Sequence, residues 1–305
     1  MKIMVFDVGG TEIKYSVMDE QMHRTDSGAV PTPQDTQAQF LDAVYRLYAP
    51  HKDEVSGIAM ALPGFVDNRT GYVSNGGALL YNTATPVGQL LTEKCGCPVI
   101  LENDGKAAAM AELANGALKG CCNAAVFIGT GVGGGIIANG QLVRGVHFTA
   151  GEYSFVNTNA EAWDAPDQNM ACQCSTSNLL KWYRARKALP EDAPLDGRSF
   201  FAAANAGEPE ALEVLRRFCH AVAVQIYNLT VLLDVEKVAI GGGISKQPLL
   251  LESLRSAYDG LYASRAGQAY MEGLPRCQIV PCAFSSEANQ VGVAAAYFEA
   301  MQKKC

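Results

Sequence analysis

The sequence lacks concentrated positive charge: no run of lysines or arginines exceeds two residues, and the formal net charge is −7. Nucleic acids and anionic membranes are bound mainly through clustered positive side chains, so neither is expected as a partner of this chain. A nucleotide remains compatible with this charge, because backbone amides and a metal ion can hold its phosphates.

Long hydrophobic runs are also absent. The apolar run that begins at Met1 is interrupted at Asp7 and is too short for a secretory signal. The most apolar stretch, 220–235, contains Gln225 and Asn228 and falls short of a membrane span. We therefore expect a soluble cytoplasmic protein, whose ten cysteines remain free thiols in a reducing compartment.

The size and composition predict two domains. The chain has 305 residues, of which 49% are hydrophobic and 18% charged, so it can bury a large interior. We expect an N-terminal lobe over 1–118 and a C-terminal lobe over 119–286. A terminal helix at about 287–303 carries small residues for close packing and could return to the first lobe.

A strand, a glycine-rich turn and a second strand occur twice in the chain. The first copy spans 3–18 around the turn 7–11, and the second spans 126–138 around the turn 128–135. This repetition predicts two related lobes with their glycines at a shared cleft. Glycine hairpins are common, so an accidental match is the alternative interpretation.

The two glycine turns are candidate phosphate sites, because unhindered backbone amides bind phosphate oxygens well. The first turn adds a hydroxyl and an acid, Asp7, that could hold a hydrated Mg²⁺. The predicted ATP-binding residues are Asp7, Gly9, Gly10, Thr11, Gly129, Thr130, Gly131 and Gly133. The alternative is two tight hairpins without a ligand. Neither turn matches the P-loop pattern, so a P-loop enzyme is excluded.

Two further segments combine a buried strand with residues suited to chemistry. Gly242 and Gly243 follow the strand 238–240 and are expected to open a helix, so their amides could face a nucleotide, although a plain connection explains them equally well. Asp104 follows the strand 99–101, beside Asn103, where a carboxylate can act as a general base. From this segment alone, a helix-capping role for Asp104 fits better, and the two roles are compatible.

Together these motifs resemble the ROK family of sugar kinases. The matching segments stand in the order and spacing of that family over essentially the whole chain: Asp7-Val8-Gly9-Gly10-Thr11, Leu62-Pro63-Gly64, Glu102-Asn103-Asp104, the run from Ile128 to Gly135, Gly151-Glu152 and Gly241-Gly242-Gly243-Ile244. Each motif is weak alone, and six in register make the resemblance specific.

The resemblance implies an α/β, two-lobed actin-like ATPase (ribonuclease H-like) fold with a central cleft. It implies ATP and Mg²⁺ as cofactors, with Asp7 holding Mg²⁺ through water, and Asp104 as the catalytic base. It also implies that Asn103 and Glu152 bond sugar hydroxyls. The substrate-binding residues expected on this basis are Gly64, Gly76, Gly77, Asn103, Asp104, Glu152 and Phe155.

Two departures from the family pattern concern the sugar pocket. Family members usually have Glu-x-Gly-His, and here Phe155 stands where the His belongs. The usual zinc knuckle is reduced to Cys172 and Cys174, which are too few ligands for a structural zinc, so zinc is not expected. These features resemble the zinc-less branch that includes β-glucoside kinases, and Tyr153 or Phe155 could stack on a sugar face.

The predicted function is transfer of the γ-phosphoryl group of ATP to a hexose hydroxyl, the 6-OH of glucose or a β-glucoside. N-acetylmannosamine or another N-acetylhexosamine is the alternative substrate. A sugar-binding regulator is an alternative of a different class, but the first phosphate motif begins at Asp7 and leaves no room for a DNA-binding segment. Apolar helices in the second lobe make a homodimer a further expectation, although burial within one chain explains them too.

Overall fold

The computed structural model describes residues 1–128 and 131–302, which divide into two compact units. Unit 1 contains Met1–Gly116, Leu142–Ala150 and Ser286–Cys305, and unit 2 contains Ala117–Gln141 and Gly151–Ser285. The segment Leu142–Ala150, which we had assigned to the C-terminal lobe, groups with unit 1. No helix in the described part of the chain has both the length and the hydropathy needed to cross a bilayer.

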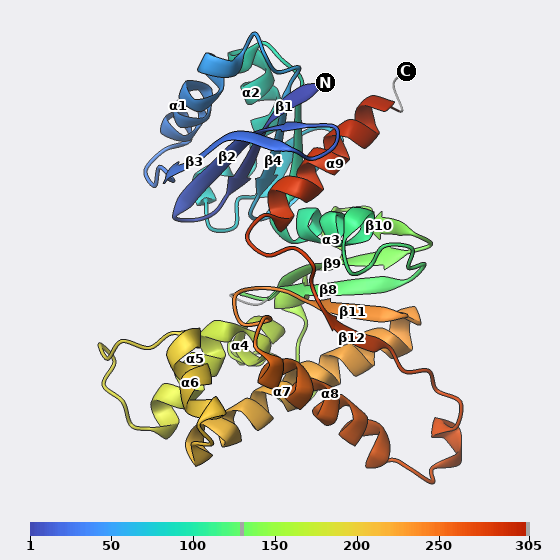
Figure 1. The fold of residues 1–305 in the computed structure, drawn as a ribbon. Helices are drawn as coiled ribbons and strands as arrows, with labels where there is room; N and C mark the ends of the chain where they lie inside the picture. The colour runs from blue at the N-terminus through green and yellow to red at the C-terminus, as the bar shows by residue number, and fades with distance from the viewer. Residues whose placement is uncertain (129–130, 303–305) are drawn as a thin grey trace. The chain divides into compact units, whose positions relative to one another are not determined.

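Unit 1 is built on a five-stranded sheet of order β3-β2-β1-β4-β7 (Figure 1). Its strands are β1 (Lys2–Val8), β2 (Glu12–Asp19), β3 (Arg24–Pro31), β4 (Ile58–Leu62) and β7 (Val99–Asn103). A small sheet pairs β5 (Phe65–Asp67) with β6 (Tyr72–Asn75). The helices are α1 (Gln37–Tyr48), α2 (Val87–Cys95), α3 (Asp104–Asn115) and α9 (Ala288–Gln302).

Helices cover both faces of the unit 1 sheet, which explains its nearly continuous apolar strands. Met4 and Phe6 of β1 lie in one buried cluster with residues of α1 and α2. The terminal helix α9 contacts β1, β4 and β7 and packs along α3, as Figure 1 shows. Gly292 permits this close approach, because a Cβ there would collide with the carbonyl oxygen of Ala107.

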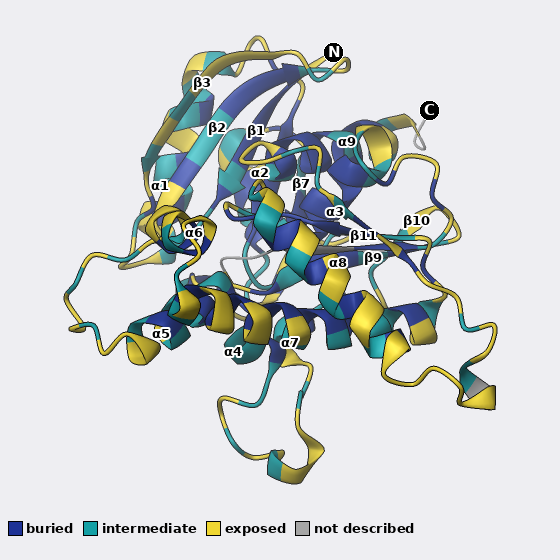
Figure 2. Cartoon of the chain, turned by 60° about the horizontal axis from the view of Figure 1, so that its bottom comes forward, coloured by how far each residue is buried: buried dark blue, intermediate teal, exposed yellow. Residues whose placement is uncertain are grey.

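Unit 2 is built on a second five-stranded sheet, of order β10-β9-β8-β11-β12. Its strands are β8 (Ala124–Ile128), β9 (Gly133–Ala138), β10 (Gln141–Val143), β11 (Lys237–Ile240) and β12 (Gln278–Pro281). The helices are α4 (Met170–Cys174), α5 (Thr176–Arg186), α6 (Gly197–Asn205), α7 (Pro209–Leu233) and α8 (Pro248–Ala263). Their apolar sides share one core cluster with the sheet, and Figure 2 shows the exposed residues of α7 and α8 on the outer sides of these helices.

The two sheets repeat one topology, which supports the duplication inferred from the sequence. In each sheet the first two strands form an antiparallel hairpin, β1 with β2 and β8 with β9. In unit 1, β1 also pairs in parallel with β4, and β4 pairs in parallel with β7. In unit 2, β8 also pairs in parallel with β11, and β11 pairs in parallel with β12. The glycine turns that we singled out join the strands of these two hairpins.

Candidate active site

The first glycine turn connects β1 to β2 and is held by its carbonyl groups. The Gly9 N–H donates to the Glu12 carbonyl at 2.9 Å, while Thr32 Oγ1 donates to the Gly9 carbonyl and Gln34 Nε2 to the Gly10 carbonyl. Among the described residues, the N–H groups of Gly10 and Thr11 have no such partner. Two backbone donors are therefore available for an anion, as the phosphate hypothesis requires.

Close approach, rather than a left-handed conformation, favours glycine in this turn. Neither Gly9 nor Gly10 has a positive φ. A Cβ on Gly10 would lie 3.1 Å from the Ala78 Cβ, and one on Gly9 would lie 3.3 Å from the Glu12 carbonyl oxygen. Both contacts are tighter than ordinary packing, so a Cβ at either position would need its neighbour to shift by a few tenths of an ångström.

Asp7, near the end of β1, is half-buried. Asn289 of α9 donates to its Oδ1 at 2.8 Å. Burial raises the pKa of Asp7 above its usual value, and the Asn289 hydrogen bond and the charge of Lys14 oppose that rise. A cation beside this carboxylate would favour its charged form, so the site is suited to a positively charged ligand.

The strand β7 passes directly into α3 at the segment 102–104. Asn103, and not Asp104, caps the helix: its Oδ1 accepts from the Lys106 N–H at 3.0 Å. The capping role considered for Asp104 is therefore wrong. Asp104 is the first residue of α3, and its Oδ1 accepts from the Gly105 N–H at 2.7 Å. A carboxylate at a helix N-terminus is stabilised in its ionised form.

The Asn103 carboxamide is almost fully used within the protein. Its Nδ2 donates to the Gly64 carbonyl at 2.9 Å and to Asp104 Oδ1 at 3.0 Å. Because both amide hydrogens and one lone pair are engaged, only one acceptor position on Oδ1 remains for a sugar hydroxyl. The contacts identify Asn103 chiefly as a residue that positions Asp104.

Arg144 is a residue of this region whose role the sequence did not reveal. Its Nε donates to Glu102 Oε2 at 2.8 Å, and Glu102, with 1% of its side chain exposed, also accepts from the Asn103 N–H. The structure places its guanidinium against a buried carboxylate, and the segment Leu142–Ala150 that carries it groups with unit 1. Spacing along the chain gave no signal for this pair.

Gly64, Gly76 and Gly77 are packed backbone against backbone. Gly64 has φ +93° and Gly77 has φ +57°. A Cβ on Gly64 would collide with the Asn75 carbonyl oxygen, and one on Gly77 would lie 2.8 Å from the Gly64 nitrogen. These glycines hold the loop whose Gly64 carbonyl accepts from Asn103. Their predicted contact with substrate stays a prediction.

The second glycine turn connects β8 to β9 in unit 2. Gly129 and Thr130 lie outside the described residues. Gly131 is exposed, and a Cβ there would meet no atom within 4 Å, while Gly133 begins β9. The following segment braces the turn: Ser154 Oγ donates to the Val132 carbonyl at 2.5 Å and Tyr153 Oη to the Gly135 carbonyl at 3.2 Å.

The predicted sugar contacts of unit 2 surround a short 3₁₀ turn, Tyr153–Phe155. Tyr153 is 3% exposed, so the expectation that it stacks on a sugar face is wrong. Phe155 is 70% exposed and can present its ring, whereas Glu152 is half-buried at the start of the turn.

Gly242 and Gly243 do not open a helix as expected. They lie in a turn after β11, with φ +85° at Gly242, and α8 begins only at Pro248. Ser245 closes this turn by donating from Oγ to the Gly242 carbonyl at 2.9 Å. A Cβ on Gly243 would meet no atom within 4 Å, so nothing in the structure requires glycine there for packing.

The donor set fits Mg²⁺ held through phosphates and water better than it fits a protein cage. Within the described residues, no three His, Cys, Asp or Glu side chains are grouped to bind a metal. Mg²⁺ commonly keeps several waters and takes one or two carboxylates together with substrate phosphates. Asp7 beside the free amides of Gly10 and Thr11 is such a single carboxylate.

Comparison with known proteins identifies one family over the whole chain. The family model described as ROK family matches residues 3–302. The beta-glucoside kinase of Listeria innocua is 30% identical over 258 residues, which are 84% of this chain and 87% of that protein.

Solved structures agree with this result. A ROK family protein from Streptococcus pneumoniae in complex with sucrose superposes with a TM-score of 0.86 at 28% identity, covering 99% of this chain and 100% of that one. A ROK family glucokinase from Streptomyces griseus in complex with glucose and AMPPNP gives 0.79 at 25% identity, covering 97% and 99%. The predicted family and actin-like two-domain ATPase fold are therefore confirmed.

Proposed function

The chain belongs to the ROK family and is an ATP-dependent sugar kinase, and we propose that its acceptor is the 6-hydroxyl of glucose or of a β-glucoside. The observation that carries the substrate proposal is Phe155, which replaces the usual His and whose side chain is 70% exposed. An aromatic ring gives an apolar surface to a sugar substituent, where an imidazole would bond a hydroxyl. The name of the Listeria innocua relative and the sucrose in the Streptococcus pneumoniae structure agree with this assignment.

We propose Asp104 as the general base. Its carboxylate accepts the proton of the attacking sugar hydroxyl, the new bond forms to the γ-phosphorus of ATP, and the bond to the β,γ-bridging oxygen breaks to release ADP. Asn103 holds Asp104 through the 3.0 Å hydrogen bond and fixes α3 through its cap. Glu152 is assigned to a second sugar hydroxyl.

The nucleotide is assigned to the glycine turns. In unit 1 the amides of Gly10 and Thr11 are proposed to bind phosphate oxygens, with Gly9 providing the close approach and Asp7 orienting hydrated Mg²⁺. In unit 2 the same role falls to 129–131 and Gly133, with Gly242 and Gly243 facing the nucleoside. Mg²⁺, when bound, neutralises phosphate charge during transfer.

The substitution Asp104→Asn tests the proposed general base, and its expected effect on kcat is large. The variant keeps an acceptor for the Gly105 N–H but cannot take a proton, so we expect kcat to fall about a hundred- to ten-thousand-fold. AMPPNP affinity by calorimetry and the thermal midpoint should stay unchanged, and Asp42→Asn serves as a surface control. Turnover within tenfold of the wild type would remove Asp104 from the mechanism.

A coupled assay over glucose, cellobiose, N-acetylglucosamine and N-acetylmannosamine tests the acceptor. We expect the highest kcat/KM with glucose or cellobiose, and a selective loss of cellobiose activity of roughly tenfold in Phe155→His. A preference for an N-acetylhexosamine would contradict the substrate proposal and leave the kinase intact. No sugar-stimulated ADP release would contradict both.

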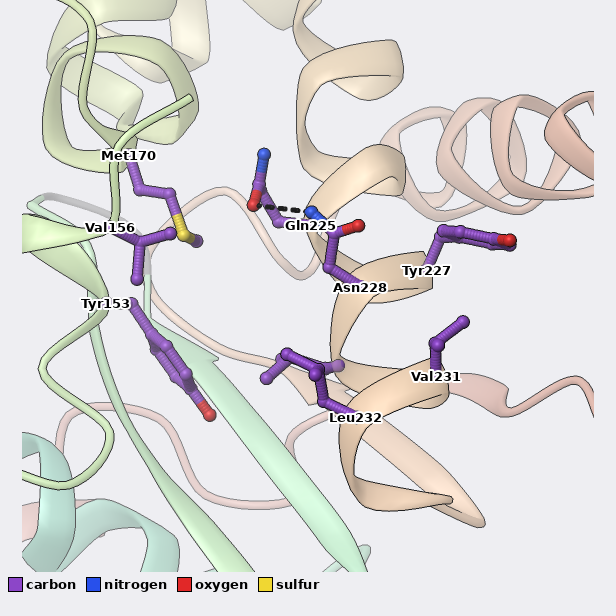
Figure 3. A pocket seen from close by; sticks show the side chains of 9 residues that line it. Tyr153, Val156, Met170, Gln225, Tyr227, Asn228, Val231 and Leu232 are labelled. Atoms are coloured by element: carbon purple, nitrogen blue, oxygen red, sulfur yellow. Dashed lines mark hydrogen bonds between the residues drawn. The ribbon is translucent and has the colours of Figure 1, made fainter. Parts of the chain in front are cut away.

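We also infer that the chain forms a homodimer through an apolar cavity of unit 2. The cavity has a volume of about 310 Å³ and is shown in Figure 3, lined by Tyr153, Val156, Met170, Gln225, Tyr227, Asn228, Leu229, Val231 and Leu232. Leu232 is 76% exposed at its edge. Such an apolar patch beside polar groups is typical of an interaction surface.

Charge complementarity favours a second copy of this chain as the partner that binds at the cavity. Val156 and Met170 stand at the base of a loop closed by the Asn157–Asn169 bridge, which carries the exposed Trp163 and the acids Glu161, Asp164 and Asp167. On the cavity side, Arg265 donates to the Tyr227 hydroxyl at 3.3 Å. An acidic loop with an aromatic residue therefore complements an apolar cavity that has an arginine, Arg265, beside it.

Light scattering on Leu232→Glu tests the dimer. Leu212→Glu is the matched control, because Leu212 is also exposed but lies about 30 Å away along α7. We expect Leu232→Glu and Trp163→Ala to give monomers and the control a dimer. A monomeric wild type, or a dimer that survives both changes, would overturn the inference.

A further inference from the structure

A second cavity in unit 2 lies between α5 and α7. None of the residues that line it was predicted to belong to a functional site. It has a volume of about 470 Å³ and is lined by Trp182, Ala185, Arg186, Glu213, Val214, Arg216, Arg217 and His220. Glu213, Arg217 and His220 of α7 stand at spacings of four and three and share one face of the helix, with Val214 and Arg216 directly beside them in the sequence. His220 is exposed here.

The lining is positively charged although the chain as a whole is acidic. Three guanidinium groups face one carboxylate, which leaves a local charge of +2 in a protein of net charge −7. Glu213 is already engaged, because Arg186 Nε donates to its Oε2 at 2.9 Å. The remaining two arginines are not neutralised by an acid of the cavity.

Arg217 is held in an orientation that leaves its donors available. Its guanidinium carbon lies 3.8 Å from the ring centroid of Trp182. An arginine at this distance over an aromatic face is stabilised there, and its N–H groups at the edge can still bind an anion. The neighbouring Arg216 is exposed and, in the part of the chain that the structure describes, has no hydrogen-bond or ion-pair partner.

We propose that this cavity, named here the arginine pocket, binds a small phosphorylated metabolite with two or more negative charges. The N–H groups of Arg216 and Arg217 hold the phosphoryl oxygens, in the manner in which guanidinium groups bind phosphate. Ala185 and Val214 provide an apolar wall for the body of the ligand. The inference stands independently of the identity of the sugar acceptor.

The test uses the full chain saturated with AMPPNP, so that a phosphate probe is directed away from the nucleotide site. Calorimetry with pyrophosphate and with glucose 6-phosphate, both at 150 mM salt, distinguishes an inorganic from a sugar-borne phosphate source. We expect one binding site for at least one probe, and about tenfold weaker binding in Arg216→Gln. Arg216 is exposed and unpaired, so this variant should fold.

Lys181→Gln is the matched control, because it removes the same charge from an exposed position of α5 outside the arginine pocket. Binding should be unchanged in this control. The proposal is overturned if neither probe binds, if Arg216→Gln and Lys181→Gln weaken binding equally, or if neither weakens it. Equal losses would mean a general charge effect rather than a site.

Discussion

The two glycine hairpins share one topology, but the side chains around them interact in different ways. In unit 1 the neighbourhood of the turn and of α3 contains the half-buried Asp7 and the Glu102–Arg144 ion pair. In unit 2 the turn is braced by neutral hydroxyls, from Tyr153 and Ser154 to backbone carbonyls. A buried charged side chain lowers the free energy of unfolding unless it is paired, and it makes that free energy depend on pH. A neutral hydrogen bond holds the backbone in place without either effect.

The largest effect expected from this difference is on turnover in Asp7→Asn. The change removes the Asp7 carboxylate that we propose orients hydrated Mg²⁺ beside the turn, so kcat should fall roughly a hundredfold or more. Steady-state kinetics against Mg²⁺ concentration measure the effect, with Glu12→Gln, at the exposed first residue of β2, as control. Equal kinetics in the two variants would show that Asp7 has no special role.

The next effect is on stability, in Arg144→Met. Glu102 is 1% exposed, so removing its partner leaves an unpaired buried carboxylate and should lower the free energy of unfolding by about 3–5 kcal/mol. Urea denaturation measures the loss. The double variant Glu102→Gln/Arg144→Met should recover most of it, and a loss below about 1 kcal/mol would mean that the pair is not structural.

In unit 2 the corresponding change is Tyr153→Phe, with a smaller effect. It removes one neutral hydrogen bond to the Gly135 carbonyl, so we expect a loss of about 1 kcal/mol in the free energy of unfolding. Tyr72→Phe, at an exposed position, is the control. If Tyr153→Phe lowered the free energy of unfolding as much as Arg144→Met does, the charged contacts of unit 1 and the neutral contacts of unit 2 would not differ in their contribution to stability.

The smallest effect is a pH dependence of the ligand-free protein. Burial raises the pKa of Asp7 in the folded state, so the folded protein favours its protonated form. The associated stability is present below the unfolded pKa and is lost as the pH rises through the folded one. Asp7→Asn should therefore be slightly more stable than wild type at pH 7, and this advantage should vanish below the ordinary pKa of Asp. A pH-independent difference in thermal midpoint would exclude the titration of Asp7 as its cause.

Local pattern was sufficient for most elements of the fold. The apolar runs at 3–6 and 238–240 became β1 and β11, because a strand that is buried on both faces needs consecutive apolar residues. The repeated hairpin was visible in the sequence because both copies keep their glycines. The assignment of Gly242 to a helix start failed, since a turn of several residues intervenes before Pro248.

The sequence by itself determined the family, the two-domain fold, the glycine turns and the candidate base, because these depend on residues that are neighbours along the chain. Only the tertiary structure decided which residue caps α3, which residues hold Asp7, and that Arg144 meets Glu102. The contacts of Asp7 with Asn289 and of Glu102 with Arg144 join side chains brought near by folding, and Arg144 stands 42 residues from its partner. A buried charge selects its partner by distance in space, and distance along the chain does not predict it.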